Sequence, residues 1–300
     1  MAGAESSADA AGSAAIGLDN GFPNGQLRIY GLIGDPVSQV RAPFPMTQKM
    51  RETRLNAALI PLHVPVDVLP TVFAGLKLIR NFDGLVVTVP HKISMAGLVD
   101  RISERALLVG AINVARRESD GSWSGDILDG VGFVRGLIDR GFDPKDQNAF
   151  VVGAGGAGCA VAVELALAGA SVRVFDVSSS RAKVFAERLQ RAGYAVASAD
   201  FADPRGSTLV VNATPLGMQP DDPLPVDPTL LSAEMLVAEV VMKPPVTRFL
   251  DHARACGCQT QLGEAVMLYQ LDDQIEFFRG SLARLIPIWV LKRRAKRPIR

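Results

Sequence analysis

One segment constrains the fold of this chain more than any other. It joins an apolar run at 148–152 to the glycine loop G-A-G-G-A-G at 153–158, a helix-like stretch ending at Ala168, and a second β-rich run at 171–176. A glycine loop alone is weak evidence, but this spacing between a strand and a helix is typical of a Rossmann-type unit. The segment therefore predicts a parallel α/β sheet that binds a dinucleotide.

The glycines of this loop have separable roles. Gly153 permits a tight turn after the strand, Gly155 lets the backbone approach a pyrophosphate, and Gly158 allows the helix to pack closely on the strand. Asp176 ends the second strand, where a carboxylate accepts hydrogen bonds from an adenosine ribose. The competing interpretation is a glycine-rich turn with a solvated aspartate. We expect the cofactor contacts to come from Gly153, Ala154, Gly155, Gly156, Ala157 and Asp176.

The first half of the chain has α/β character as well. Its β-rich runs at 27–33, 60–64, 84–89 and 111–114 alternate with helix-like stretches at 43–57, 67–80 and 93–106. A helix-like stretch at 131–140 ends at a glycine and marks the expected domain boundary. The proline-rich stretch 215–228 predicts a long functional loop. Two terminal helices are expected, at 264–278 and 281–292.

Composition excludes several classes of partner. Lys and Arg number 32 against 31 Asp and Glu, so the net charge of +1 offers no overall attraction for nucleic acid or an anionic membrane. No apolar run reaches membrane-spanning length, and residues 1–25 read as a disordered tail. Three cysteines describe no disulfide framework and fit a reducing cytoplasm. Cys256 and Cys258 lack a second ligand pair, so no metal is expected, and the basic run 292–297 is interpreted as solvated.

Six short motifs together resemble the shikimate/quinate dehydrogenase family. They keep that family's order between residues 29 and 278 and read G-D-P-V at 34–37, T-V-P-H-K at 88–92, G-A-I-N at 110–113, G-D-I-L-D-G at 125–130, G-A-G-G-A at 153–157 and N-A-T-P at 212–215. The resemblance implies an α/β substrate domain at 26–130 and a Rossmann domain at 131–263, with a cleft between them. Residues 264–300 would then return to the substrate domain as terminal helices.

The resemblance also implies a catalytic pair. Lys92 and Asp129 match the family's lysine and aspartate, and hydride transfer from an alcohol needs a group that takes the hydroxyl proton. Each residue has a structural alternative, Lys92 as a solvated helix-start lysine and Asp129 as a helix N-cap.

Further positions match ligand contacts of the family. Thr88, Asn113 and Gln270 match substrate-binding positions, although a β-propensity threonine, a turn asparagine and a surface glutamine remain alternatives. The remaining cofactor positions implied are Asn212, Ala213, Thr214 and Gly263.

The departures from the family pattern concern the substrate. Val40 and Ala42 stand where two serines hold the substrate carboxylate, and other polar or tyrosine positions read Val86, Ile127, Leu128 and Met242. We therefore expect an apolar pocket and poor activity on shikimate. Val177 follows Asp176 where NADP-using relatives carry arginine, which favours NAD.

Three functions are compatible with this pattern. The leading one is an NAD-dependent dehydrogenase for a compact, cyclic hydroxy acid or alcohol, acting as a monomer or homodimer on a small molecule. A catalytically silent metabolite sensor is the alternative, disfavoured by the retained Lys92 and Asp129. A folate dehydrogenase is a third, disfavoured by the T-V-P-H-K and G-D-I-L-D-G motifs.

Overall fold

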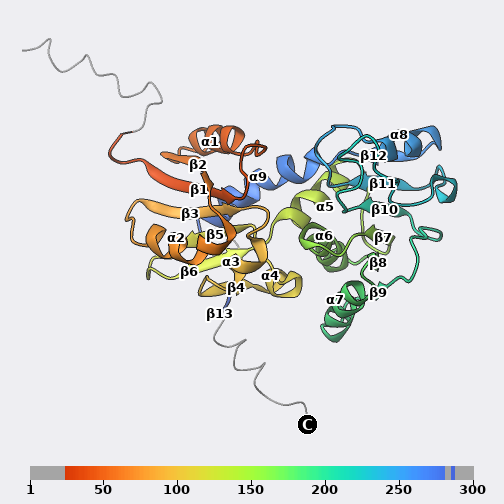
Figure 1. Cartoon of the computed structure of the whole chain (residues 1–300), viewed down its shortest axis with the longest axis horizontal. Coiled ribbons are helices and arrows are strands. Elements are labelled where there is room, and N and C mark those ends of the chain that lie inside the picture. The colour runs from red at the N-terminus through yellow and green to blue at the C-terminus, as the bar shows by residue number, and fades with distance from the viewer. Residues whose placement is uncertain (1–23, 281–284, 288–300) are drawn as a thin grey trace, which may run out of the picture.

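The computed structural model describes residues 24–280 and 285–287, which form two α/β units side by side (Figure 1). Within these residues the first sheet has the order β13-β4-β6-β5-β3-β1-β2. Its strands are β1 Arg28–Gly34, β2 Ala57–His63, β3 Phe82–Val87, β4 Arg101–Ser103, β5 Val114–Arg117, β6 Trp123–Asp126 and β13 Leu285–Pro287. Strand β1 runs parallel to β2 and β3, whereas β5 is antiparallel to both of its neighbours. The helices of this unit are α1 Pro43–Glu52, the short η1 Val66–Val68, α2 Leu69–Leu76, α3 Lys92–Ala96 and α4 Glu104–Val109.

The second sheet is parallel throughout and has the order β12-β11-β10-β7-β8-β9. Its strands are β7 Asn148–Val152, β8 Ser171–Phe175, β9 Val196–Ser198, β10 Leu209–Asn212, β11 Leu236–Glu239 and β12 Gln259–Gln261. Its helices are α6 Gly156–Leu167, α7 Ser179–Arg191, the short η2 Pro228–Leu230 and α8 Arg248–Ala255. The strand order reverses between β7 and β10, and ligands of such sheets bind outside the carboxyl ends of the strands at that point. The Rossmann prediction is confirmed.

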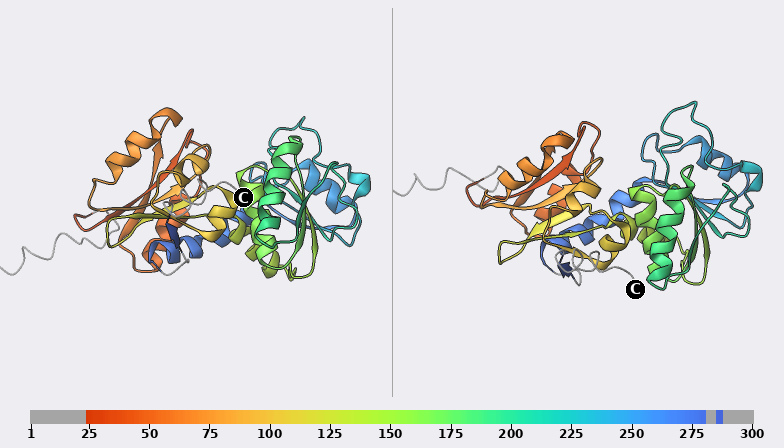
Figure 2. Two further views of the ribbon diagram at one scale, coloured as in Figure 1. Left: turned by 90° about the horizontal axis from the view of Figure 1, so that it is seen from below. Right: turned by 60° about the horizontal axis from the view of Figure 1, so that its bottom comes forward.

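Helices α5 Asp129–Asp139 and α9 Glu264–Phe278 lie between the two sheets (Figure 2). Helix α5 packs against both α6 and α9, and α9 also contacts α1 and β5. Glycines make this close packing possible: a Cβ on Gly130 would lie 2.2 Å from the Ala160 carbonyl oxygen, and one on Gly132 would lie 2.4 Å from that of Val266. The expected bounds of α9 are confirmed.

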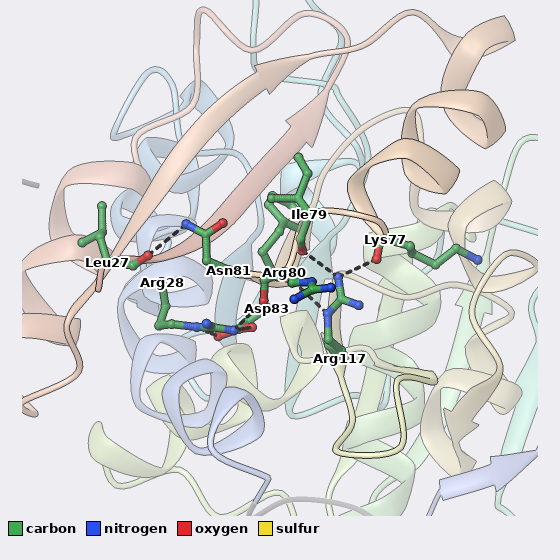
Figure 3. A network of polar contacts seen from close by, with 9 residues as sticks. Leu27, Arg28, Lys77, Ile79, Arg80, Asn81, Asp83 and Arg117 are labelled. Atoms are coloured by element: carbon green, nitrogen blue, oxygen red, sulfur yellow. Dashed lines mark hydrogen bonds and ion pairs between the residues drawn. The ribbon is translucent and has the colours of Figure 1, made fainter. Parts of the chain in front are cut away.

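A polar network holds the loop that precedes β3 (Figure 3). The Arg28 guanidinium pairs with Asp83 and donates to the Arg80 carbonyl at 3.0 Å. From β5, Arg117 donates to the carbonyls of Lys77 and Ile79 at 2.9 and 3.0 Å. These bonds join the loop to β1 and β5, the strands on either side of β3, and so constrain the position of β3. The T-V-P-H-K motif follows the other end of β3.

Several expectations about local structure need correction, and some lie outside the described residues. The stretch 93–106 is not one helix, because β4 pairs with β6 in its middle and Ser103 starts a new helix by accepting a hydrogen bond from Ala106 N at 3.1 Å. The run 111–114 lies mostly before its strand, since β5 begins at Val114. Residues 285–287 of the expected second terminal helix form β13, antiparallel to β4. The rest of that helix, tail residues 1–23 and the basic run 292–297 lie outside the described residues.

Candidate active site

Lys92 and Asp129 meet at the junction of the two units. Lys92 is the first residue of α3, directly after the turn that follows β3, and Asp129 is the first residue of α5. The Lys92 Nζ donates to Asp129 Oδ2, and both side chains are mostly buried, at 17% and 9% exposure. Neither structural alternative describes these contacts, because Lys92 is not solvated and Leu128, not Asp129, precedes the helix as its cap.

Amide side chains extend this pair into a network. Asn113 Nδ2 donates to Asp129 Oδ1 at 2.8 Å and to Gln270 Oε1 at 2.9 Å, while its own Oδ1 accepts from Leu128 N at 2.8 Å. Gln274 Nε2 donates to the same Gln270 oxygen at 2.9 Å. With its oxygen doubly engaged, Gln270 keeps its amide nitrogen without a partner among the described residues. That nitrogen is a donor available to a ligand oxygen.

The first aspartate of the G-D-I-L-D-G motif has a positioning role. Asp126 is fully buried, and its Oδ1 accepts hydrogen bonds from Ile127 N at 2.7 Å and from the Ser103 hydroxyl. Arg105 Nε lies 3.1 Å from the same oxygen, and Arg105 Nη1 lies 3.4 Å from Glu164 Oε2. Burial outweighs the nearby arginine and raises the pKa of Asp126. These contacts hold the turn that presents Asp129.

The expected apolar substitutions gather in one cluster. Val86 and Leu128 are buried in it, and Val40 and Ala42 pack against it while remaining partly exposed. The side chains of Val40 and Ala42 offer no hydroxyl to a ligand at these positions. Thr88 follows β3, and its hydroxyl has no hydrogen bond to any described residue.

Two of the expected pocket residues are not part of this apolar cluster. Ile127 packs in a different and larger core, at 2% exposure. Met242 is 44% exposed and belongs to none of the buried clusters of the described chain. The apolar wall is therefore smaller than the sequence suggests.

The glycine loop has the shape that a dinucleotide requires. Gly153 has φ of 105°, and a Cβ on Gly158 would lie 1.9 Å from the Gly153 carbonyl oxygen. Gly155 is the extended cap residue of α6, and an added Cβ at Gly155 or Gly156 meets open space. The first-turn N–H groups of α6 are thus reachable by an anion. These residues, with Ala157 beside them, fit a pyrophosphate.

Asp176 lies next to this loop. Its carboxylate accepts from Ala154 N at 2.7 Å and from Ser178 N at 2.8 Å, and it is 7% exposed. Arg181, in the first turn of α7, reaches Asp176 Oδ2 at 3.4 Å. Sequence analysis missed this arginine, whose only signal is its place in the first turn of the helix that follows the strand.

A second loop lies across the switch point, at the end of β10. Thr214 donates to Asn212 Oδ1 through its N–H at 3.1 Å and its hydroxyl at 2.7 Å, and Asn212 Nδ2 donates to the Leu216 carbonyl at 2.9 Å. Asn212 therefore shapes the loop with a fully buried side chain. Ala213 borders the glycine loop, because a Cβ on Gly153 would lie 2.9 Å from the Ala213 carbonyl oxygen.

Glu239 supports this loop from the end of the neighbouring strand β11, and Gly263 lies at the start of α9. Glu239 Oε2 accepts from the Thr247 hydroxyl at 2.9 Å and from Asn212 Nδ2 at 3.4 Å, while Oε1 is buried without a partner among the described residues. Burial raises the pKa of Glu239 to about 7. Gly263 caps α9, and a Cβ there would lie 2.1 Å from the Val241 carbonyl oxygen. Sequence analysis missed Glu239, since an acid ending a buried strand has no motif of its own.

Two further features concern the described part of the chain. No group of three His, Cys, Asp or Glu residues within it could hold a metal ion. None of its helices has the length and apolar character needed to cross a membrane.

Comparisons with known proteins identify the family of this chain. Residues 32–115 match the family model described as the shikimate dehydrogenase substrate binding domain. A shikimate dehydrogenase (NADP(+)) of Rubrobacter xylanophilus is 38% identical over 255 residues, which cover 82% of this chain and 89% of that protein. Two solved structures, 5-ketofructose reductase of a Gluconobacter strain and quinate dehydrogenase of Corynebacterium glutamicum in complex with NAD, are each 30% identical with a TM-score of 0.76. The match to 5-ketofructose reductase covers 86% of this chain, and the match to quinate dehydrogenase covers 84%. Each match covers 94% of the solved protein. The chain therefore belongs to the shikimate dehydrogenase family, whose members are oxidoreductases that use a nicotinamide dinucleotide.

Proposed function

We propose that this protein is an NAD-dependent dehydrogenase that acts on a compact, cyclic hydroxy acid or alcohol and uses shikimate poorly. The observation that carries the proposal is the buried contact between Lys92 and Asp129 at the junction of the two units. A bound nicotinamide ring would supply the hydride acceptor. The residues of the chain then have to bind the substrate and move one proton.

Lys92 is the residue we assign to the hydroxyl proton. Its amino group takes the proton as the substrate is oxidised and returns it in the reverse direction. Asp129 stabilises the charged form of the lysine, and Asn113 holds the carboxylate from its other oxygen. Gln270 offers its free amide nitrogen to a substrate oxygen, and the Thr88 hydroxyl offers a second polar contact.

The weak use of shikimate follows from what is missing. A hydrogen bond to a charged group contributes about 1.5–3 kcal/mol, so the absence of two serine hydroxyls at Val40 and Ala42 weakens recognition of a carboxylate by orders of magnitude. The solved protein named 5-ketofructose reductase is as similar to this chain as the quinate dehydrogenase is. Proteins 30% identical to this chain are thus named for differing substrates, whereas the relative at 38% identity is named a shikimate dehydrogenase, so the argument against shikimate rests on Val40 and Ala42.

The preference for NAD depends on Asp176. Two backbone N–H groups stabilise its carboxylate, and a negative charge there repels the 2′-phosphate of NADP. Arg181 offsets part of this charge from 3.4 Å. Known relatives include a protein named as NADP(+)-dependent and one solved in complex with NAD, so the ratio of kcat/KM for the two cofactors is the deciding measurement. NADP used as well as NAD would contradict the proposal.

The alternative function is a sensor that binds a metabolite without turnover. A panel of cyclic hydroxy acids, polyols and ketoses, with absorbance of the reduced cofactor as readout, separates the two. We expect turnover with a member of the panel, and Lys92→Ala should lower kcat by about two orders of magnitude or more while NAD affinity is kept. Ligand binding by calorimetry with no turnover of any bound compound would support the sensor.

We place the protein in the reducing cytoplasm, since Cys159, Cys256 and Cys258 are free thiols.

A further inference from the structure

One cavity of the structure is lined by none of the residues of the candidate active site. It has a volume of about 550 Å³, within the range of about 300–1,000 Å³ usual for small-molecule pockets. Two segments of the Rossmann unit line it: the loop 217–225 after β10, and residues 243–251, which run from the loop after β11 into the first turn of α8. Among the described residues of the first unit, only Arg41 lines the cavity. Arg41 lies in the loop between β1 and α1. None of Lys92, Thr88, Asn113, Asp129 or Gln270 lines this cavity.

The walls of the cavity are apolar and stiff. Five prolines line it, and Met218, Leu224, Val246 and Phe249 add further apolar surface. Because proline restricts the backbone, these loops lose little freedom when a ligand enters. Arg248 steadies the rim by donating to the Pro220 carbonyl at 3.1 Å.

The charges in the cavity are unequally matched. Asp222 accepts hydrogen bonds from Gly217 N at 3.0 Å and from Gln219 N at 2.9 Å, so its carboxylate is engaged by its own loop. Asp251 is paired with Arg254 at 3.7 Å. Arg41 and Lys243, by contrast, form no ion pair or hydrogen bond with any described residue. Arg248 also lines the cavity, and it donates to a carbonyl oxygen but to no carboxylate among the described residues. Three cations therefore line the cavity without an anion of the described chain paired to them.

We propose that this cavity binds a compact organic carboxylate between Arg41 of the substrate unit and Lys243 of the Rossmann unit, separately from the site at Lys92. The carboxylate group pairs with the two cations, and the apolar body contacts the prolines, Met218 and Phe249. A ligand held in this way touches both units. It also contacts the loop that follows Thr214, and Arg41 itself lies between Val40 and Ala42.

The test measures binding of benzoate to the full chain by calorimetry, with benzyl alcohol as the uncharged analogue and inorganic phosphate as an anion without an apolar body. We expect benzoate to bind at least about tenfold more tightly than either analogue, since only benzoate satisfies both the charge and the walls. Benzyl alcohol or phosphate binding as tightly as benzoate would overturn the proposal, as would an absence of benzoate binding.

Variants locate the binding. Arg41→Gln and Lys243→Gln should each weaken benzoate binding about tenfold, whereas Lys183→Gln, an exposed lysine on α7, should leave it unchanged. Lys92→Ala should also leave it unchanged, because Lys92 does not line the cavity. Loss of benzoate binding in Lys92→Ala, or normal binding in both glutamine variants at 41 and 243, contradicts a separate site. Thermal unfolding of each variant checks that the fold is kept. Because binding is measured without turnover, the outcome is independent of the proposed dehydrogenase activity.

Discussion

Replacing Glu239 with glutamine should change how the stability of this protein depends on pH. The side chain is fully buried at the end of β11, with hydrogen bonds to one oxygen only, and its pKa is raised from 4.5 to about 7. The cause is burial, which disfavours the charged carboxylate, against the smaller effects of the hydrogen bonds from Thr247 and Asn212.

The sign follows from proton binding in the two states. Below pH 4.5 the group is protonated in both the folded and the unfolded chain, and its contribution to stability is fully present. As pH rises from 4.5 to 7, the unfolded chain releases the proton while the folded chain retains it, so stability is lost. Above pH 7 the loss is complete. A rise from 4.5 to about 7 corresponds to about 3 kcal/mol, of which about 2–3 kcal/mol falls between about pH 5 and pH 8.

Glu239→Gln removes this titration while retaining an oxygen that can accept from Thr247. The assay is urea unfolding of the wild type and the variant at about pH 5 and pH 8. The difference in free energy of unfolding between variant and wild type should shift by about 2–3 kcal/mol in favour of the variant at the higher pH. Glu187→Gln, at an exposed glutamate on α7, is the matched control and should shift little. Equal pH dependence of the wild type and Glu239→Gln would refute the assignment of a raised pKa to this group.

Three further predictions concern the cofactor loop and the substrate. Gly158→Ala should lower Tm by several degrees and abolish NAD binding in a fluorescence titration, because the new Cβ would lie 1.9 Å from a carbonyl oxygen of the loop. Gly156→Ala, whose added Cβ meets open space, is the control and should keep the wild-type Tm. Asp176→Ala should narrow the ratio of kcat/KM for NAD over NADP, since the repelling carboxylate is gone, and an unchanged ratio would argue against its role. The double variant Val40→Ser with Ala42→Ser should raise kcat/KM for shikimate about tenfold or more, and no gain in steady-state assays would show that these positions do not limit use of the carboxylate.

The nucleotide-binding half was readable from the sequence because its signals are local. A tight turn, a close approach of helix to strand and a helix N-terminus each require glycine within a few residues, and the structure has Gly153 and Gly158 in these roles. The bounds of α9 were readable for a similar reason, as a long helix-like stretch between two glycines. The expected helix 93–106 was wrong because its secondary structure depends on a segment distant in the sequence. Residues 101–103 form β4 because β6 pairs with them, and helix propensity alone does not predict this pairing.

The catalytic pair was named through family resemblance, but its contact belongs to the tertiary structure. Lys92 and Asp129 are thirty-seven residues apart, and Gln270 joins their network through Asn113 across 157 positions. Gln274 and Arg181 were not predicted, because their roles depend on which face of a helix meets the site.

By itself, the sequence determined the kind of protein: a parallel nucleotide-binding sheet, a glycine loop open to a pyrophosphate, and a substrate unit without serine hydroxyls at 40 and 42. Only the tertiary structure decided which charges meet and which are buried. It joins Lys92 to Asp129 and buries Glu239 with one oxygen unpaired, and it leaves Arg41 and Lys243 facing an apolar cavity without partners among the described residues. The physical reason is that turn geometry depends on neighbouring residues, whereas burial and charge pairing depend on segments that come together only when the chain folds.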